Sequence, residues 1–71
     1  DLTFVVARTS DSTVNISARS HKTINVQRIM EKMGGGGHFN LAACQLRDCS
    51  VAQAKNKLIE TIMGELAPKE D

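Results

Sequence analysis

The chain has 71 residues, of which 41% are hydrophobic and 24% are charged. This length leaves no room for a second core, so we expect a single folded domain over residues 1–71, with a composition unlike that of disordered chains. The formal net charge is +1, so no long-range field draws the domain to duplex DNA or to a membrane surface. Any binding of anions must therefore be local.

Cysteine and histidine content argue against a disulfide or metal scaffold. Cys44 and Cys49 are too few to staple a secreted fold, and no stretch reads as a signal peptide or a spanning helix. The two cysteines, together with His21 and His38, do not follow a common zinc-ligand spacing. We therefore expect reduced thiols and no metal in this chain. Because the sequence starts at Asp1 without a methionine, we also expect a piece of a longer polypeptide.

The first two predicted elements form a hairpin. Residues 2–9 and 13–20 are rich in β-branched side chains, and a polar turn over residues 10–12 separates them. Side chains alternate between the two faces of a strand. The second strand thus presents one apolar face (Val14, Ile16, Ala18) and one polar face (Asn15, Ser17, Arg19).

A helix and a third strand are predicted next. Asn25 is a suitable N-cap, apolar residues follow at helical spacing as far as Met33, and Gly34 is placed to end the helix. After the glycines, residues 41–47 alternate again and indicate a strand.

The last predicted element is a long helix. Ser50 and Gln53 have the spacing of a capping box, and Pro68 is expected to terminate the helix. The order strand-strand-helix-strand-helix (β-β-α-β-α) predicts an α+β fold, in which two helices pack on a small mixed β-sheet.

Four consecutive glycines followed by His38 form the stretch that folding alone does not demand. Glycines lose much backbone entropy on ordering, and successive glycines with positive φ can direct their N–H groups into an anion-binding nest. His38 and Arg19 are side chains that can contact a phosphate. A flexible loop, a close approach of two backbones and a solvated arginine explain the same residues, and these alternatives stay open. The run fits neither a P-loop nor a dinucleotide-binding turn.

Several segments together resemble the DHHA1 domain, the substrate-binding C-terminal unit of DHH-family phosphodiesterases. They are residues 17–20 (SARS), 24–26 (INV), 34–38 (GGGGH) and the alanine pair at 42–43. Three residues separate His38 from this pair where most members of the superfamily have two, and Cys44 stands where they have glycine. This departure, with the run AACQL at 42–46, resembles the GdpP (YybT) subgroup of cyclic di-AMP phosphodiesterases.

The resemblance implies a two-part enzyme. In such enzymes a preceding DHH domain binds manganese and cleaves cyclic di-AMP to pApA, and the parent protein is anchored in the bacterial membrane with this domain on the cytoplasmic side. This chain lacks the Asp and His ligand set, so we expect it to contain no catalytic residue, to bind cyclic di-AMP or pApA beside the DHH domain, and to be inactive alone.

Carried over by position, the resemblance assigns phosphate contacts to a short set of residues. They are the side chains of Arg19, Ser20 and His38, the backbone N–H groups of Gly35, Gly36 and Gly37, and, as a further candidate, Ser17. Phe39, Asn40 and Gln45 are candidates for base recognition. An oligoribonuclease or pAp phosphatase of the same superfamily, and a non-catalytic interaction module, remain alternatives.

Overall fold

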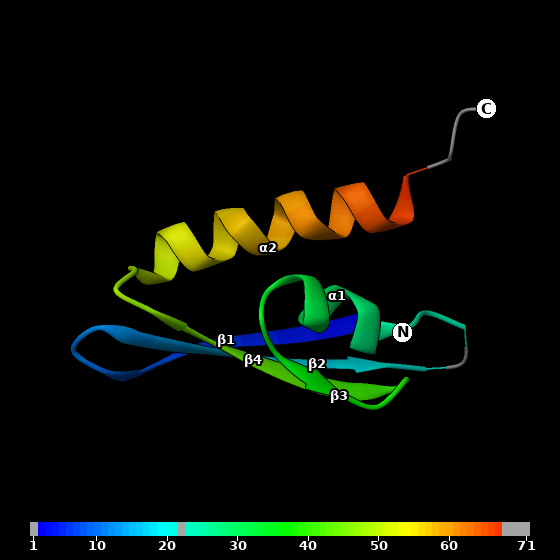
Figure 1. Cartoon of the computed structure of the whole chain (residues 1–71), viewed down its shortest axis with the longest axis horizontal. Coiled ribbons are helices and arrows are strands. Elements are labelled where there is room, and N and C mark those ends of the chain that lie inside the picture. The colour runs from blue at the N-terminus through cyan, green and yellow to red at the C-terminus, as the bar shows by residue number, and fades with distance from the viewer. Residues whose placement is uncertain (1, 22, 68–71) are drawn as a thin grey trace.

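A computed structural model describes residues 2–21 and 23–67 (Figure 1). Four strands form one sheet, and both helices lie on the same side of it. The strands are β1 (Leu2–Ser10), β2 (Thr13–Ser20), β3 (Gly36–Gly37) and β4 (Leu41–Arg47), and the helices are α1 (Val26–Lys32) and α2 (Val51–Leu66). The strands stand in the order β1-β2-β4-β3.

The predicted α+β class is confirmed, whereas the sheet is antiparallel in all of its described pairings and not mixed. The difference comes from β3, a strand that could not be predicted from the sequence. Without it, a helix crossing from β2 to the next strand would make the two strands parallel. The short strand β3 reverses the chain once more, so β4 returns antiparallel to β2.

The alternation predicted for β2 is confirmed. Val14, Ile16 and Ala18 are buried, at 0%, 0% and 1% exposure, while Ser17 and Arg19 are exposed on the opposite face. Strand β1 follows the same rule, because Phe4 and Val6 pack against the core and Val5 is exposed. One face of the sheet thus belongs to the core. We call the other face, which carries Val5, Ser17, Arg19, Leu41 and Ala43, the open face.

Helix α1 has the predicted start and end. The side chain of Asn25 accepts a hydrogen bond from the N–H of Arg28 (3.3 Å). At the other end Gly34 has φ of 89° and donates to the carbonyl of Glu31 (3.0 Å), while the N–H of Gly35 donates to the carbonyl of Met30 (2.8 Å). This pair of bonds is a Schellman motif, in which glycine is the usual residue at the position of positive φ.

Helix α2 begins with the predicted capping box. The N–H of Ser50 donates to Gln53 Oε1 (2.8 Å), and the N–H of Gln53 donates to Ser50 Oγ (3.1 Å). Near its other end Glu65 binds Arg28 (2.8 Å) and Lys32 (2.7 Å) of α1, so an ion-pair cluster joins the two helices. The predicted stop at Pro68 lies outside the described residues. Neither helix of the described part is long and apolar enough to span a membrane.

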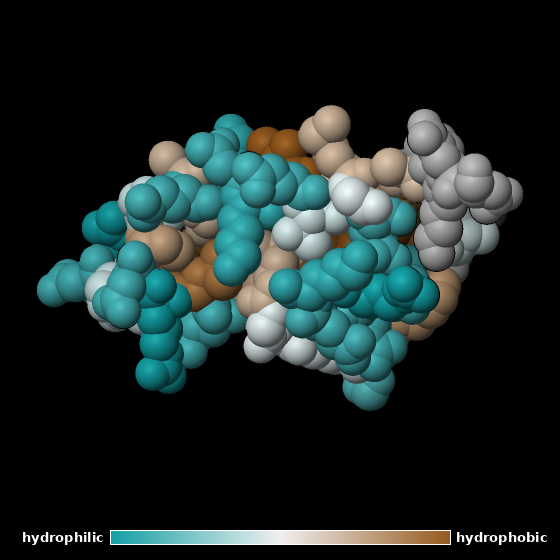
Figure 2. All heavy atoms as spheres, turned by 45° about the horizontal axis from the view of Figure 1, so that its top comes forward, coloured by the Kyte–Doolittle hydropathy of each residue, from teal (hydrophilic) through white to brown (hydrophobic). Residues whose placement is uncertain are grey.

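The core lies between the helices and one face of the sheet, and among the described residues its fully buried side chains are aliphatic or contain sulfur, with Phe4 partly buried against them. Its largest fully buried residues are Val14, Ile16, Val26, Ile29 and Met30. Figure 2 shows the side of the molecule that carries α2, where hydrophilic residues cover most of the surface and apolar ones gather toward its upper edge. Both helices lie on the core side of the sheet (Figure 1), and on the open face Val5 and Leu41 are exposed within the described chain.

Candidate functional site

Two rows of residues cross the open face side by side. In the first, Arg19 of β2 lies between Thr3 of β1 and Leu41 of β4. His38 extends this row, because its N–H donates to the carbonyl of Leu41 (2.7 Å) and its carbonyl accepts from the N–H of Leu41 (3.3 Å). The backbone positions of Arg19 and His38 are thus separated by a single strand. Two residues that are 19 positions apart in the sequence, Arg19 and His38, therefore meet at one end of the sheet.

The second row contains Ser17 and Gly36. Ser17 of β2 lies between Val5 of β1 and Ala43 of β4, and Ala43 in turn pairs with Gly36 of β3. Neighbouring residues of adjacent strands direct their side chains to the same face. Ser17 and Gly36 therefore share the open face with Arg19, as a phosphate-binding group would require.

The hairpin tip that carries His38 is held in place by the rest of the fold. The N–H of Val26, at the start of α1, donates to the carbonyl of Phe39 (2.9 Å), and the N–H of Ser20 donates to the carbonyl of Asn40 (3.0 Å). Asn40 Nδ2 also donates to Ser20 Oγ (2.9 Å). His38 is exposed at a tip whose backbone is fixed by these bonds.

Ser20 belongs to this support and is not brought together with Arg19. Its side chain is 6% exposed and lies on the core face of β2, one position after Arg19. The hydroxyl donates to the carbonyl of Ile24 (2.6 Å) while it accepts from Asn40. The alternation of β2 directs its side chain away from the open face. The structure thus uses Ser20 to fix the turn after β2.

At three of the four consecutive glycines, the fold itself explains why the residue is glycine. Gly34 occupies the left-handed position of the Schellman motif. A Cβ at Gly35 would come within 2.1 Å of the carbonyl oxygen of Ala43, and one at Gly37 within 2.5 Å of the Cα of Ala42. The close approach of two backbones, one of the alternatives left open by the sequence, is present. Because the N–H of Gly35 is bonded to Met30, it is not free to form the expected nest.

Gly36 is the exception in the run. A Cβ added there would meet nothing within 4 Å, and its φ lies outside the left-handed region. The described fold therefore tolerates a side chain at this position. On the open face, the missing side chain leaves a stretch of bare backbone in the same row as Ser17.

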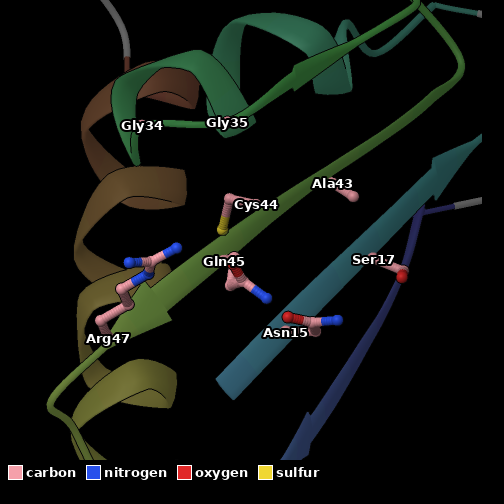
Figure 3. Close-up of a pocket in the computed structure, with 8 residues that line it drawn as sticks. All are labelled: Asn15, Ser17, Gly34, Gly35, Ala43, Cys44, Gln45 and Arg47. Atoms are coloured by element: carbon pink, nitrogen blue, oxygen red, sulfur yellow. The ribbon is translucent and has the colours of Figure 1, made fainter. Parts of the chain in front are cut away.

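A hollow lies further along the sheet (Figure 3). We call it the second hollow, to distinguish it from a hollow beside Arg19 that is described below. The side chains of Asn15, Gln45 and Arg47 line it together with the glycine end of α1. Asn15 Oδ1 is buried and has no hydrogen-bond partner within residues 2–21 and 23–67. Gln45, a candidate for base recognition, belongs to this hollow and pairs with Asn15, which puts it two rows away from Arg19 along the sheet.

The thiol of Cys44 lies on the core face of β4, and its reactivity gives a first testable prediction. Burial raises the pKa of the Cys44 thiol above its ordinary value, an effect that nearby Lys57 partly opposes. Since only the thiolate is alkylated, we expect Cys44 to react with iodoacetamide more slowly than the half-buried Cys49 at pH 8, and to need a higher pH. Mass spectrometry of the labelled chain measures both rates. Equal rates in the folded chain would contradict the prediction, and unfolding in urea should abolish the difference.

In the part of the chain that the structure describes, no group of three or more His, Cys, Asp or Glu side chains lies close enough to hold a metal ion. The described residues thus do not fit the manganese pair that the resemblance implies for the parent enzyme, and we derive no metal-dependent step from them.

Sequence reasoning missed three residues of the open face, namely Thr3, Val5 and Leu41. Together with Ser17 and Arg19 they line a hollow beside the arginine. The alternation of side chains along β1 could have indicated Thr3 and Val5, because these residues alternate with Leu2 and Phe4, which pack against the core. The pairing of β4 with β2, which decides where Leu41 lies, was not visible in the sequence.

Comparison with known proteins agrees with these features. The DHHA1 domain model matches residues 1–67. The chain is 52% identical over 59 residues to the cyclic-di-AMP phosphodiesterases GdpP of Geobacillus thermodenitrificans and PdeA of Listeria monocytogenes, covering 83% of the chain and 9% of either relative. It is 34% identical over 62 residues to the bifunctional oligoribonuclease and PAP phosphatase NrnA of Thermus thermophilus, covering 87% of the chain and 19% of NrnA. The chain thus spans about a tenth of the length of its GdpP-type relatives, and it belongs to the DHHA1 domain family.

Proposed function

We propose that this domain binds the substrate of a cyclic di-AMP phosphodiesterase by holding a phosphate group at Arg19, Gly36 and His38. The observation that carries the proposal is Gly36. It is the glycine of the run that the described fold does not need, and it lies on the open face beside the row of Arg19 and His38. Bare backbone next to a cation allows the oxygens of a phosphate to approach closely.

Arg19 supplies the charge in this arrangement. It is exposed, and within residues 2–21 and 23–67 no acidic side chain forms an ion pair with it, whereas Arg28 and Lys32 are both bound to Glu65. A guanidinium that keeps its donors free can contact two phosphate oxygens at once.

Gly37 and His38 add hydrogen-bond donors at the edge of the sheet. In an antiparallel pair, hydrogen-bonded and non-bonded residue pairs alternate. Since His38 and Leu41 exchange both bonds, the next pair, Gly37 with Ala42, is of the non-bonded kind. The N–H of Gly37 then points away from β4, where a ligand can accept its hydrogen bond.

In this proposal, the partner of the domain is the rest of the parent enzyme. A preceding DHH domain would hold the manganese ions, which activate water for cleavage of the phosphodiester, and this chain alone would be inactive. The parent would be anchored in the membrane with this domain in the cytoplasm. The higher identity to GdpP and PdeA, 52% against 34% for NrnA, favours a cyclic dinucleotide over short RNA as the substrate.

Calorimetric titration of the chain with pApA tests the role of Gly36. In Gly36→Val we expect an unchanged melting temperature to within a few degrees, since the site has room, but an affinity at least about tenfold lower, because the side chain occupies the place of the phosphate. Gly64→Ala is the control: an added Cβ at Gly64 also meets nothing within 4 Å, and this glycine lies on α2, away from the open face, so its substitution should leave the affinity unchanged. Wild-type affinity in Gly36→Val would refute the proposed site.

A further inference from the structure

A hollow with aliphatic walls adjoins Arg19 on the open face. Val5 of β1 and Leu41 of β4 are 57% and 54% exposed, and β2 runs between them. Ser17 is the neighbour of Val5 on β2, and Arg19 lies between Thr3 and Leu41, so these five residues line the hollow together. The volume is about 380 Å³, which is within the range of about 300–1,000 Å³ typical of small-molecule sites.

Val5 and Leu41 thus form an exposed aliphatic pair on the open face of the sheet, and apolar patches rimmed by polar groups are typical of ligand-binding surfaces. Val5 and Leu41 stand beside the guanidinium of Arg19, which forms no ion pair within residues 2–21 and 23–67. A ligand that suits this arrangement has a flat, apolar part joined at short range to an anionic group. A nucleotide has this form, because its base is attached through the ribose to the phosphate.

We propose that the hollow between Val5 and Leu41 receives the nucleobase next to the phosphate held by Arg19. This inference rests on the proposed function and extends it to base recognition. The aliphatic walls contact the faces of the base, and the hydroxyls of Thr3 and Ser17 are within the same hollow to bind its edge. A hydroxyl both donates and accepts hydrogen bonds, so these groups suit more than one base.

The residues that the sequence offered for base recognition are placed elsewhere. Asn40 has its side-chain amide bonded to Ser20, at the turn. Gln45 lies at the second hollow with Asn15. Phe39 is 43% exposed in the turn, and it does not line the hollow beside Arg19. Val5 and Leu41 are thus the apolar side chains that the fold brings next to the cation.

The test compares two ligands that share a sugar phosphate. We expect the wild-type chain to bind pApA more tightly than ribose 5-phosphate, which lacks a base, as measured by calorimetry. In Val5→Ser and Leu41→Ser this advantage should fall by at least about fivefold, because the aliphatic contact is lost, while the affinity for ribose 5-phosphate stays the same. Ile59→Ser, which changes an aliphatic side chain of similar exposure on α2 (43%), is the control and should preserve the advantage. Retained amide NMR spectra would show that all variants fold.

The outcomes separate this inference from the function on which it rests. If neither ligand binds the wild-type chain, the proposed function and the base site fall together. If both ligands bind and Arg19→Ala weakens both, but Val5→Ser and Leu41→Ser keep the full advantage of pApA, the phosphate site stands and the base site is refuted. An equal loss of both ligands in Leu41→Ser also refutes the base site, since it would show that Leu41 acts on phosphate binding through Arg19 or His38.

Discussion

Gly35→Ala is expected to lower the free energy of unfolding by more than about 3 kcal/mol, the upper end of the usual cost of overpacking. A Cβ at this position would come within 2.1 Å of the carbonyl oxygen of Ala43 and 2.5 Å of the Cβ of Cys44. Neither neighbour can move freely, because Ala43 lies in the middle of β4 and Cys44 is part of the core. The end of α1 must therefore separate from the sheet.

Urea unfolding followed by circular dichroism measures this loss. Domains have total stabilities of about 0.05–0.15 kcal/mol per residue, so a loss of this size removes much of the stability of so short a chain. Gly36→Ala is the matched control, one residue further along, where nothing lies within 4 Å, and it should change the stability by less than about 1 kcal/mol. Equal stability of the two variants would mean that Gly35 does not approach β4 as described.

Arg19→Ala is expected to lower the affinity for pApA by about 10- to 100-fold, which corresponds to the roughly 1.5–3 kcal/mol of a charge-assisted hydrogen bond. Arg19 is exposed, so the fold should be unaffected. Arg19→Lys keeps the charge without the planar pair of donors and should recover only part of the loss.

Arg8→Ala controls for the net charge in this comparison. Arg8 is also an exposed arginine of the hairpin, and it pairs with Val14, far along the strands from the row of Arg19. Calorimetric titration at constant ionic strength compares the variants. Similar losses in Arg8→Ala and Arg19→Ala would show that general charge, and not a site, attracts the ligand.

The elements that carry periodic side chains could be predicted from the sequence, and the one without them could not. The buried face of β2 follows from alternation, and the capping box of α2 from the spacing of Ser50 and Gln53. Strand β3 consists of two glycines, which have no side chain and so no pattern. Because this strand reverses the chain, missing it also made the predicted sheet mixed instead of antiparallel.

In the candidate site, too, the features that follow from side-chain alternation could be predicted, and those that depend on tertiary contacts could not. Alternation alone directs Arg19 to the open face and Ser20 to the core, although the sequence analysis grouped the two as phosphate contacts. The separate roles of the glycines are tertiary properties. Gly35 and Gly37 are required by the closeness of β4, while Gly36 is not, and a sequence of four identical residues cannot display that difference. The ligand contacts of these residues stay predictions.

We propose that the open face near Arg19 and His38 binds the phosphate of a dinucleotide. An amide NMR titration of the ¹⁵N-labelled chain with pApA tests it most directly, since every described strand reports at once. Shifts are expected at Gly36, Gly37 and His38 and at the row of Arg19, with α2 unchanged. Saturable shifts confined to α2, or no shifts at millimolar pApA, would contradict it.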